Sequence, residues 1–332
     1  MRAPAGWWQQ KAGLSARLLQ PFGMIYGAIT AARMQKSGAR VDANVICVGN
    51  FVAGGAGKTP TALALGKTLQ AQGRIIAFLS RGFGGALAST QPLRVDPTQH
   101  GAADVGDEPL LLARLAPTFI CIDRAAGAHA AIETGANTII MDDGLQNPSL
   151  MKDLRIAVVD GETGIGNGMC VPAGPLRAPM AAQWPHVEAI VILGEGEAGD
   201  IVADQARSHG KLVVRAQLKP QNADAIKGKN VYAFAGMGRP EKFFHTLRKH
   251  GAIISAAQDF ADHHPYSLQE LEQIRILSRA DTRDAQTLVT TEKDAMRIPS
   301  GALPGLVVLR VELEFDDPSA LDALIAAKLS HG

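Results

Sequence analysis

A lysine and a threonine that follow a glycine-rich turn are the residues whose types and spacing best suit a chemical role. Residues 45–49 form a short apolar run typical of a buried parallel strand, and a helix-compatible stretch covers residues 61–70. Between them, Gly-Gly-Ala-Gly at 54–57 precedes Lys58 and Thr59. Such a turn lets backbone N–H groups approach a phosphate, and the N-terminus of the helix adds positive potential. The pattern therefore predicts a phosphate-binding loop.

In this loop we expect Lys58 to meet the β- and γ-phosphates of ATP and Thr59 to meet a magnesium ion. The loop is a variant, because the first glycine of the usual G-x-x-x-x-G-K-[ST] pattern would fall at Val52. A chance glycine-rich turn is the other interpretation, and the flanking strand and helix disfavour it. The predicted nucleotide-binding residues are Val52, Ala53, Gly54, Gly55, Ala56, Gly57, Lys58 and Thr59.

Two adjacent aspartates, Asp142 and Asp143, follow a second apolar run at 138–141. A P-loop enzyme places the acid that holds magnesium, directly or through water, at the end of such a strand. By itself the tripeptide Asp-Asp-Gly is usually only a turn. Together with the phosphate-binding loop it predicts a metal ligand, and the sequence leaves open which of the two carboxylates contacts the metal.

Further strand-like runs alternate with helix-compatible segments, which is the pattern of a mainly parallel sheet with helices on both faces. These runs cover residues 75–79, 119–122, 156–159 and 189–193. Parallel strands gather ligand-binding loops at the edge of the sheet where they end. Arginines in glycine- or proline-rich loops near these ends suit phosphate binding, with a surface salt bridge as the alternative for each. The predicted substrate-binding arginines are Arg81, Arg124 and Arg177.

Two alternating stretches, at 212–218 and 306–315, favour a two-stranded ribbon that joins a smaller C-terminal α/β lobe to the first domain. The predicted fold class is therefore α/β and P-loop NTPase-like, with a second, smaller lobe. The expected divisions are an N-terminal segment over residues 1–40, a P-loop domain over 41–211, and the smaller lobe with its linker strands over 212–332.

The first forty residues are basic and amphipathic, although the formal net charge of the whole chain is only +1. They have no acidic residue and six basic ones, Arg2, Lys11, Arg17, Arg33, Lys36 and Arg40. A helix kinked or broken near Pro21 is predicted by apolar residues at close to helical spacing, Trp7, Leu14, Leu18, Phe22, Ile25 and Ile29. Such a helix can lie on an anionic membrane, or it can pack on the domain with a solvated basic edge.

The composition is that of a globular protein. A chain of 332 residues is long enough for two domains, with one large domain as the alternative. Charged residues make up 20% and nearly cancel, which does not favour nucleic-acid binding. The three cysteines include no Cys-x-x-Cys pair, so neither a disulfide framework nor a zinc site is indicated. Neither a transmembrane run nor a signal peptide is found, so we expect the protein to stay in the cytoplasm.

Seven motifs occur in an order and spacing that resemble the tetraacyldisaccharide 4'-kinase family of lipid A biosynthesis. They begin at positions 54, 80, 106, 142, 172, 236 and 291 and read GGAGKTP, SRGFGG, GDEP, DDGLQ, PAGPLR, GMGRP and TEKD. Each motif alone is weak, whereas seven in order are very specific. The resemblance spans nearly the whole chain.

The resemblance implies transfer of the γ-phosphoryl group of ATP, with Mg²⁺, to the 4'-hydroxyl of a tetraacylated glucosamine disaccharide 1-phosphate. It places this reaction at the cytoplasmic face of the inner membrane of a Gram-negative bacterium, in a cleft between two α/β lobes. It also favours the membrane interpretation of residues 1–40, since the acyl chains of such a substrate stay in the bilayer. We expect a monomer whose partners are the lipid disaccharide and an anionic membrane surface, with no nucleic acid.

Carried over to this sequence, the family pattern makes Asp107 the base that takes the proton of the sugar hydroxyl and places Glu108 near the metal. His263 would pair with Asp107 from the other lobe, although the adjacent His264 leaves the choice of imidazole open. A carboxylate oriented by an imidazole is a chemically sensible way to activate an alcohol. Gln146, in the motif that begins at position 142, is expected to contact the substrate.

Leu145, Asn147 and Arg239 depart from the family pattern, in which an aromatic residue and a histidine are common at the first two positions. The departure puts in doubt any role for position 147. One rival interpretation is a deviant P-loop ATPase, but such proteins carry a lysine where this chain has Ala53. Another is a membrane-bound nucleotide switch, which has no need of an acid-base pair that reaches across two lobes.

Overall fold

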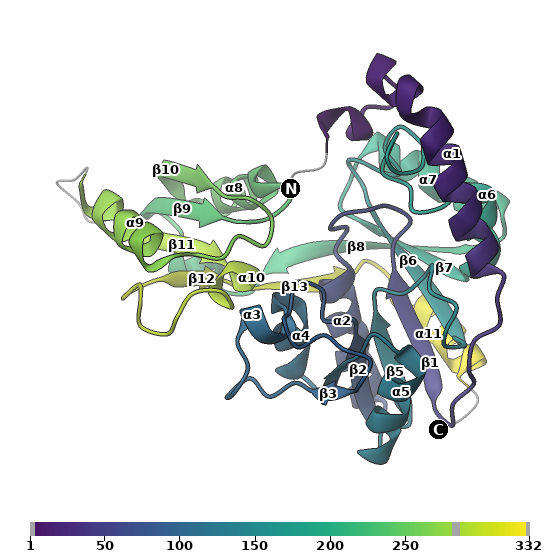
Figure 1. Ribbon diagram of the computed structural model, residues 1–332. Helices are drawn as coiled ribbons and strands as arrows, with labels where there is room; N and C mark the ends of the chain where they lie inside the picture. Colours follow the sequence, from purple (N-terminus) through teal and green to yellow (C-terminus); the bar gives the residue numbers. More distant parts are fainter. Residues whose placement is uncertain (1–3, 281–285, 330–332) are drawn as a thin grey trace.

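Two β-sheets form the cores of a larger and a smaller lobe (Figure 1). The computed structural model describes residues 4–280 and 286–329, and Arg2 of the basic segment lies outside them. The larger sheet contains β1 (Asn44–Gly49), β2 (Ile76–Ser80), β3 (Leu93–Arg94), β4 (Thr118–Ile120), β5 (Thr138–Asp142), β6 (Leu154–Asp160), β7 (Ala189–Leu193), β8 (Leu212–Pro220) and β13 (Val311–Phe315). The smaller sheet contains β9 (Asn230–Ala235), β10 (Ile253–Asp259), β11 (Thr287–Thr291) and β12 (Val307–Leu309).

Helices connect most of these strands. The α-helices are α1 (Leu14–Met34), α2 (Lys58–Ala71), α3 (Ala102–Val105), α4 (Asp107–Ala113), α5 (Arg124–Glu133), α6 (Met180–Gln183), α7 (Glu197–Ser208), α8 (Pro240–Lys249), α9 (Leu268–Ala280), α10 (Glu292–Ala295) and α11 (Ser319–Lys328). Short 3₁₀ turns are η1 (Ala5–Trp8), η2 (Trp184–His186) and η3 (Ala223–Ala225).

The centre of the larger sheet is parallel, in the order β4-β2-β5-β1-β6-β7-β8. Strands β3 and β13 run antiparallel at its two edges. Every residue of β1 and β5 is buried, which explains their unbroken apolar runs, because helices cover both faces of a sheet of this kind. The predicted fold class is confirmed.

Successive side chains of β1 point into different layers of the larger lobe. Val48 packs with Leu65 of α2 and Ile325 of α11 on one face of the sheet. Cys47, its neighbour in the chain, packs with Ala128 of α5 on the other face. This alternation follows from the two-residue period of a strand. The carboxyl ends of the parallel strands are left as the edge where loops can meet a ligand.

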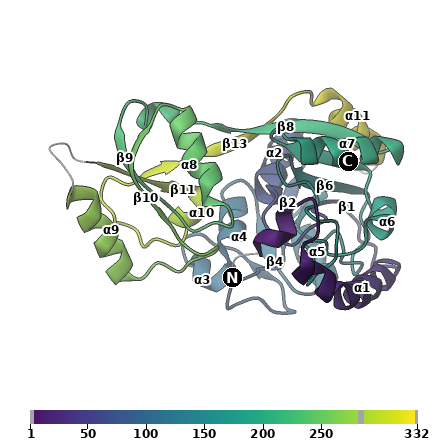
Figure 2. The same cartoon turned by 90° about the horizontal axis from the view of Figure 1, so that it is seen from above.

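Strands β8 and β13 form an antiparallel pair that leads from the larger sheet to the smaller lobe (Figures 1 and 2). The predicted ribbon is present, but the expectation of one strand over 306–315 is wrong. The strand is interrupted at Arg310, so that β12 pairs with β11 in the smaller sheet and β13 pairs with β8 in the larger sheet. The backbone N–H of Arg310 donates to Asn222 Oδ1 at 2.9 Å instead of to a strand, which lets the chain cross between sheets.

The smaller lobe contacts the carboxyl-end edge of the larger sheet (Figure 2). Arg239 Nη1 lies 3.0 Å from Asp160 Oδ1 at the end of β6. Met296 of the smaller lobe packs against the apolar cluster that contains Val105 and Leu110. The domain divisions given above stay a prediction, and β8 belongs to the larger sheet although it leads into the smaller lobe.

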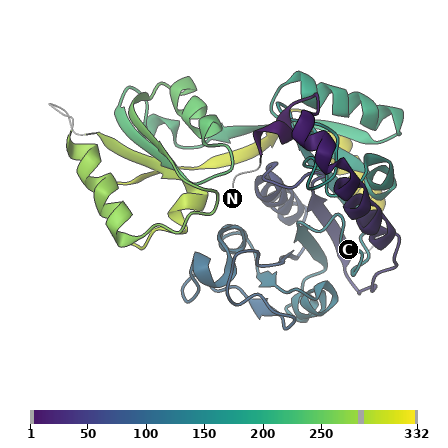
Figure 3. The ribbon, with the colours of Figure 1, turned by 45° about the horizontal axis from the view of Figure 1, so that its top comes forward.

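Helix α1 runs along the outside of the larger lobe (Figure 3). The predicted break at Pro21 is wrong, because one helix extends from Leu14 to Met34 with Pro21 inside it, and a kink there stays a prediction. Pro21 has no backbone N–H, so the helix loses one hydrogen bond there. Packing of α1 against the larger lobe stabilises the turns that follow. A Cβ at Gly23 would lie 2.7 Å from Cys170 O, so the backbone of α1 approaches the lobe closely. Trp7 lies outside the helix, in η1.

Candidate active site

The predicted phosphate-binding loop connects β1 to α2. Gly57 has a φ of 88°, which side-chain-bearing residues rarely adopt, and a Cβ there would collide with the side chain of Leu193. Asn50 Nδ2 donates to Gly54 O at 2.9 Å and closes the loop on itself. Because α2 starts directly after Gly57, the first backbone N–H groups of the helix face this loop.

The backbone groups of Val52 and Ala53 form hydrogen bonds with other residues of the protein. The Val52 carbonyl accepts a hydrogen bond from Arg177 Nε at 3.0 Å, and the Ala53 N–H donates to Pro175 O at 2.7 Å. The Val52 side chain is buried where the usual loop has glycine. These bonds leave residues 54–59 as the part of the loop that can surround a phosphate.

The loop and the two aspartates lie together at the carboxyl ends of β1 and β5, which are neighbours in the sheet. Thr59 Oγ1 donates to Asp142 Oδ2 at 3.0 Å. Lys58 Nζ lies 3.5 Å from Asp143 Oδ2. The structure therefore brings the predicted nucleotide-binding and metal-binding residues into contact.

Asp142 and Asp143 have opposite electrostatic surroundings. Burial, and then the nearby charge of Glu108, raise the pKa of Asp142 to about 7. Although burial also opposes ionisation of Asp143, the charges of Lys58 and Arg177 hold its pKa far below the usual range. Arg177 binds both oxygens of Asp143, at 2.8 and 2.9 Å. Within the described residues, Asp142 Oδ1 is buried without a hydrogen-bond partner.

Asp107 and His263 meet across the two lobes. His263 Nδ1 lies 3.1 Å from Asp107 Oδ1, although 156 residues separate them in the chain. Burial by itself raises the pKa of Asp107, but the hydrogen bond from His263 and the surrounding charges lower it to about 2. The same hydrogen bond raises the pKa of His263. The neighbouring imidazole, His264, pairs instead with Glu270 at 2.9 Å, so the geometry selects His263 as the partner of Asp107.

Two further cations of the smaller lobe approach the Asp107–Glu108 pair, and the sequence analysis missed both. Lys293 Nζ lies 2.7 Å from Glu108 Oε1. Arg297 Nη2 lies 3.4 Å from Asp107 Oδ2. Lys293 stands in the TEKD motif, so its position was a usable signal. The identity of its partner was not readable from the sequence.

Strained backbone occurs at this site. Among the described residues other than glycine, only Asp143 and His263 have positive φ angles, at 60° and 56°. A left-handed conformation costs a non-glycine residue about 1 kcal/mol or more and is held only where the surroundings require it. Both residues belong to the predicted site, one in each lobe.

The three arginines predicted to bind substrate differ in their exposure and in their partners. Arg81 is exposed at the end of β2. Arg177 is tied to Asp143. Arg124 is buried and donates to the carbonyls of Ser80 and Cys121, so it braces two strand ends.

Gln146 likewise contacts the protein. Its Nε2 donates to Asn50 O and to Gln183 Oε1, both at 2.8 Å, and so supports the start of the phosphate-binding loop. Among the four residues predicted to bind substrate, Arg81 is therefore the one whose side chain the structure leaves exposed.

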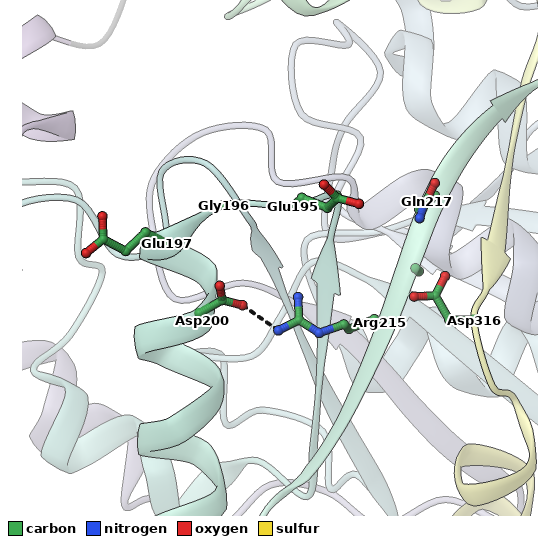
Figure 4. Close-up of a pocket in the computed structure, with 9 residues that line it drawn as sticks. Glu195, Gly196, Glu197, Asp200, Arg215, Gln217 and Asp316 are labelled. Atoms are coloured by element: carbon green, nitrogen blue, oxygen red, sulfur yellow. Dashed lines mark hydrogen bonds and ion pairs between the residues drawn. The ribbon is translucent and has the colours of Figure 1, made fainter.

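A cavity of about 510 Å³ lies beside the loop that follows β7 (Figure 4). Glu195, Asp200 and Asp316 line it, and Arg215 within it is paired with Asp200. This excess of carboxylates does not suit a triphosphate. None of residues 54–59 is among those that line the cavity, so it is separate from the predicted phosphate site at Lys58.

A parallel α/β sheet with a phosphate-binding loop after β1, acids at the end of β5 and a carboxylate paired across two lobes defines a P-loop kinase. Residues 15–330 match the family model described as Tetraacyldisaccharide-1-P 4'-kinase. The chain belongs to the tetraacyldisaccharide 4'-kinase family.

Relatives and a solved structure agree with this assignment. The tetraacyldisaccharide 4'-kinase of Methylobacterium nodulans is 55% identical over 332 residues, which cover 99% of this chain and 96% of the relative. A protein of the same name from a strain of Methylorubrum extorquens is 53% identical and covers 98% of both chains. A crystal structure described as LpxK from Aquifex aeolicus in complex with ATP shares the fold, with a TM-score of 0.73 and 23% identity over 95% of this chain and 99% of that one.

Proposed function

We propose that this protein transfers the γ-phosphoryl group of ATP to the 4'-hydroxyl of a tetraacylated glucosamine disaccharide 1-phosphate, a step of lipid A biosynthesis. Family membership over nearly the whole chain supports the substrate and the reaction. The observation that carries the proposal is the Asp107–His263 pair, a carboxylate and an imidazole from two lobes held beside the phosphate-binding loop. A protein that only bound nucleotide would have no use for this pair.

The phosphate end of ATP binds at residues 54–59 in this proposal. Lys58 leaves Gly54 O and Asp143, each 3.5 Å from its Nζ, to meet the terminal phosphates. These contacts are long for hydrogen bonds, so little is lost when the ammonium turns to a phosphate. Asp143 remains bound to Arg177 through both of its oxygens, so it keeps a charged partner when Lys58 turns away.

The residues around Asp142 fit a magnesium ion. Among the residues that the structure describes, the buried Asp142 Oδ1 has no hydrogen-bond partner, and Asp142, Thr59 and Glu108 supply the oxygen donors that magnesium prefers. The ion supplies neutralisation of charge on the phosphates. Asp142 is the better ligand of the two aspartates, since Arg177 already occupies both oxygens of Asp143.

Asp107 accepts the proton of the 4'-hydroxyl while the sugar oxygen attacks the γ-phosphorus and ADP leaves. A pKa of about 2 keeps this carboxylate ionised at neutral pH. A weak base is sufficient, because the transition state of phosphoryl transfer is loose and positioning dominates. His263 Nδ1 lies 3.1 Å from one oxygen of this carboxylate and 3.2 Å from the other, so it holds the carboxylate in a fixed orientation. Arg81, exposed at the end of β2, is available for the anionic groups of the substrate.

The N-terminal segment holds the enzyme at an anionic membrane surface, which we place at the cytoplasmic face of the inner membrane. Helix α1 exposes a stripe of large apolar side chains, Leu14, Leu18, Phe22, Ile25 and Ile29. Exposed basic residues border this stripe, Lys11, Arg17, Arg33, Lys36 and Arg40. Basic residues beside an apolar stripe suit a helix that lies in the headgroup region of a bilayer. No helix among the described residues is long and apolar enough to cross a membrane.

Label transfer tests the proposed reaction. The purified protein, as a monomer in detergent micelles, is incubated with γ-labelled ATP, magnesium and tetraacyldisaccharide 1-phosphate. We expect a labelled lipid with the label at the 4' position, and no labelled product from a lipid whose 4' position already carries a phosphate. No labelled lipid, under conditions in which the protein still binds ATP, would contradict the assignment.

A further inference from the structure

Helices α4 and α10 form one of the contacts through which the smaller lobe reaches the acid pair, beside the direct contacts of His263 and Arg297 with Asp107. Two ion pairs connect these helices. At the start of α4, Lys293 Nζ lies 2.7 Å from Glu108 Oε1. At its end, Arg114 Nη1 lies 3.8 Å from Glu292 Oε1. The same two helices therefore hold one ion pair inside the site and one outside it.

The turn that carries Lys293 is rigidly anchored by the next residue. Asp294 is fully buried, and its Oδ1 accepts hydrogen bonds from the Gly236 N–H at 2.8 Å and from Tyr266 Oη at 2.7 Å. Its Oδ2 accepts a hydrogen bond from Thr291 Oγ1 at 2.5 Å, and Arg297 Nη2 lies 3.3 Å from Oδ1. A carboxylate with this many partners keeps one orientation, so α10 presents Lys293 from a fixed frame.

We propose that Lys293 is a positioning residue for phosphoryl transfer: it orients Glu108 and makes the arrangement of the acid pair depend on contact between the two lobes. The proposal rests on the proposed kinase function. It goes beyond that function because the ammonium acts through Glu108 and connects the smaller lobe to the site.

The charges around Glu108 explain why a cation is needed there. Asp107 and Asp142 are both close enough to Glu108 for the three carboxylates to repel one another. The Lys293 ammonium lies 2.7 Å from Glu108 Oε1, where it balances part of this negative charge and holds the Glu108 side chain toward the smaller lobe.

A lysine at this place also weakens the attraction of the acids for a divalent cation. Asp107, Glu108 and His263 each offer one ligand atom, and these atoms lie within 4.8 Å of one another. Without Lys293, no fixed ammonium beside Glu108 opposes a metal ion at these three ligand atoms, where the ion does not serve transfer. The affinity for a divalent cation without nucleotide should then rise while turnover falls. General loosening of the structure would instead lower both.

The test compares Lys293→Met, Lys293→Arg and the control Arg114→Met in the full-length protein. Lys293→Met keeps the length of the side chain and removes its charge. Arg114→Met removes the other ion pair of the same helix contact, and its guanidinium lies outside the site. The readouts are kcat and KM with ATP and the lipid disaccharide, the affinity for Mn²⁺ without nucleotide from the electron paramagnetic resonance signal of free Mn²⁺, and the midpoint of thermal unfolding.

For Lys293→Met we expect kcat to fall about a hundredfold with KM for ATP changed by less than about threefold, since the lost interaction acts on positioning. Removing a cation close to the three carboxylates should tighten Mn²⁺ binding by roughly tenfold. Lys293→Arg should recover most of kcat and the original Mn²⁺ affinity. Arg114→Met should resemble the wild type in kcat and Mn²⁺ affinity.

Unchanged kcat or unchanged Mn²⁺ affinity in Lys293→Met would overturn the proposal, and so would equal losses in Arg114→Met. If Lys293→Met does not fold, Lys293→Gln measured beside Lys293→Arg makes the same comparison. Mn²⁺ binding needs no substrate. A wild-type protein that labels no lipid would therefore reject the proposed function, while the Mn²⁺ affinities would still decide the role of Lys293.

Discussion

At the scale of single residues, Asp142 and Asp143 show how neighbours in a chain acquire different chemistry. Asp143 adopts a φ of 60°, which turns its carboxylate to Arg177 and Lys58. Asp142 stays in the strand, and its side chain reaches Thr59 at the start of α2. The charge of Asp143 is thereby balanced by Arg177 and Lys58, whereas Asp142 keeps an oxygen that can bind an added cation.

This difference predicts different outcomes for the same isosteric change. Asp142→Asn removes a metal ligand and should raise the magnesium concentration needed for half-maximal activity by at least about tenfold. Asp143→Asn should leave the magnesium requirement within about threefold and lower the thermal midpoint, because Arg177 loses its charged partner. Magnesium titrations and thermal unfolding of the two variants provide the measurement. An equal rise in magnesium requirement for both would contradict the assignment of the metal to Asp142.

Site residues that are neighbours in sequence could be predicted directly, and those that meet only after folding could not. Lys58 and Thr59 were read from a local pattern, and the structure places them beside the predicted acids. The partner of Asp107 came only from the family resemblance, since a histidine 156 residues away has no local signature. Arg124 and Gln146 were expected to contact substrate, yet the structure turns them to backbone and side-chain groups of the protein.

At the scale of elements, one face of α1 packs against the larger lobe, and the opposite face is exposed. Gly23 and Gly27 form the inner face and let the helix approach Cys170 and Pro179 closely. Phe22 and Ile25 on the outer face are 62% and 61% exposed. Side chains this exposed add little to the stability of the fold, so their apolar character needs another explanation.

Phe22→Glu combined with Ile25→Glu should weaken binding to anionic vesicles at least about tenfold, because two apolar side chains are lost to the bilayer. The free energy of unfolding should change by less than about 0.5 kcal/mol. Vesicle sedimentation and thermal unfolding measure the two effects.

The control for α1 is Ile276→Glu combined with Leu277→Glu on α9, which also replaces exposed apolar residues but in the other lobe. This control should bind vesicles like the wild type. Equal binding by the α1 variant and the wild type would show that the stripe on α1 is not a membrane contact.

The elements of the larger lobe could be predicted well because buried parallel strands carry continuous apolar runs. Residues 189–193 were predicted as a strand and form β7 with the same limits. The break at Arg310 and the unbroken helix through Pro21 could not be predicted, since both depend on contacts between distant segments. Local patterns predict the type of an element more reliably than the place where tertiary contacts interrupt or extend it.

At the scale of the whole molecule, a second group of ion pairs joins the two lobes, apart from the contacts of the acid pair. Asp160, at the end of β6, pairs with Arg239 and Lys242 of the smaller lobe. Burial alone would raise the pKa of Asp160, but Lys242 and Arg239 outweigh it and lower the pKa. A carboxyl whose pKa is lower in the folded state adds stability above its ordinary pKa of about 3.9, and this stability is lost as the pH falls through the folded value.

Asp160→Asn should therefore reduce the free energy of unfolding by roughly 1–3 kcal/mol at pH 7. The difference from the wild type should begin to shrink as the pH falls through about 3.9, where the carboxyl of the unfolded chain takes up its proton, and should vanish only below the lower pKa of the folded state. Urea unfolding at pH 7, 5 and 3.5 measures the trend. Asp204→Asn, which removes an exposed pair with Arg207, is the control and should cost about 0.5 kcal/mol or less. A difference that does not depend on pH would exclude the ion pair as the cause.

The proposed reaction depends on Asp107 acting on the lipid hydroxyl from a site that only the two lobes together complete. The direct measurement is label transfer from ATP to the lipid disaccharide by the wild type and by Asp107→Asn, with ATP binding measured in parallel. We predict that Asp107→Asn binds ATP like the wild type while transfer falls by about 10²–10⁴-fold, the usual contribution of a positioned base. Transfer within a few-fold of the wild type would contradict this role for Asp107.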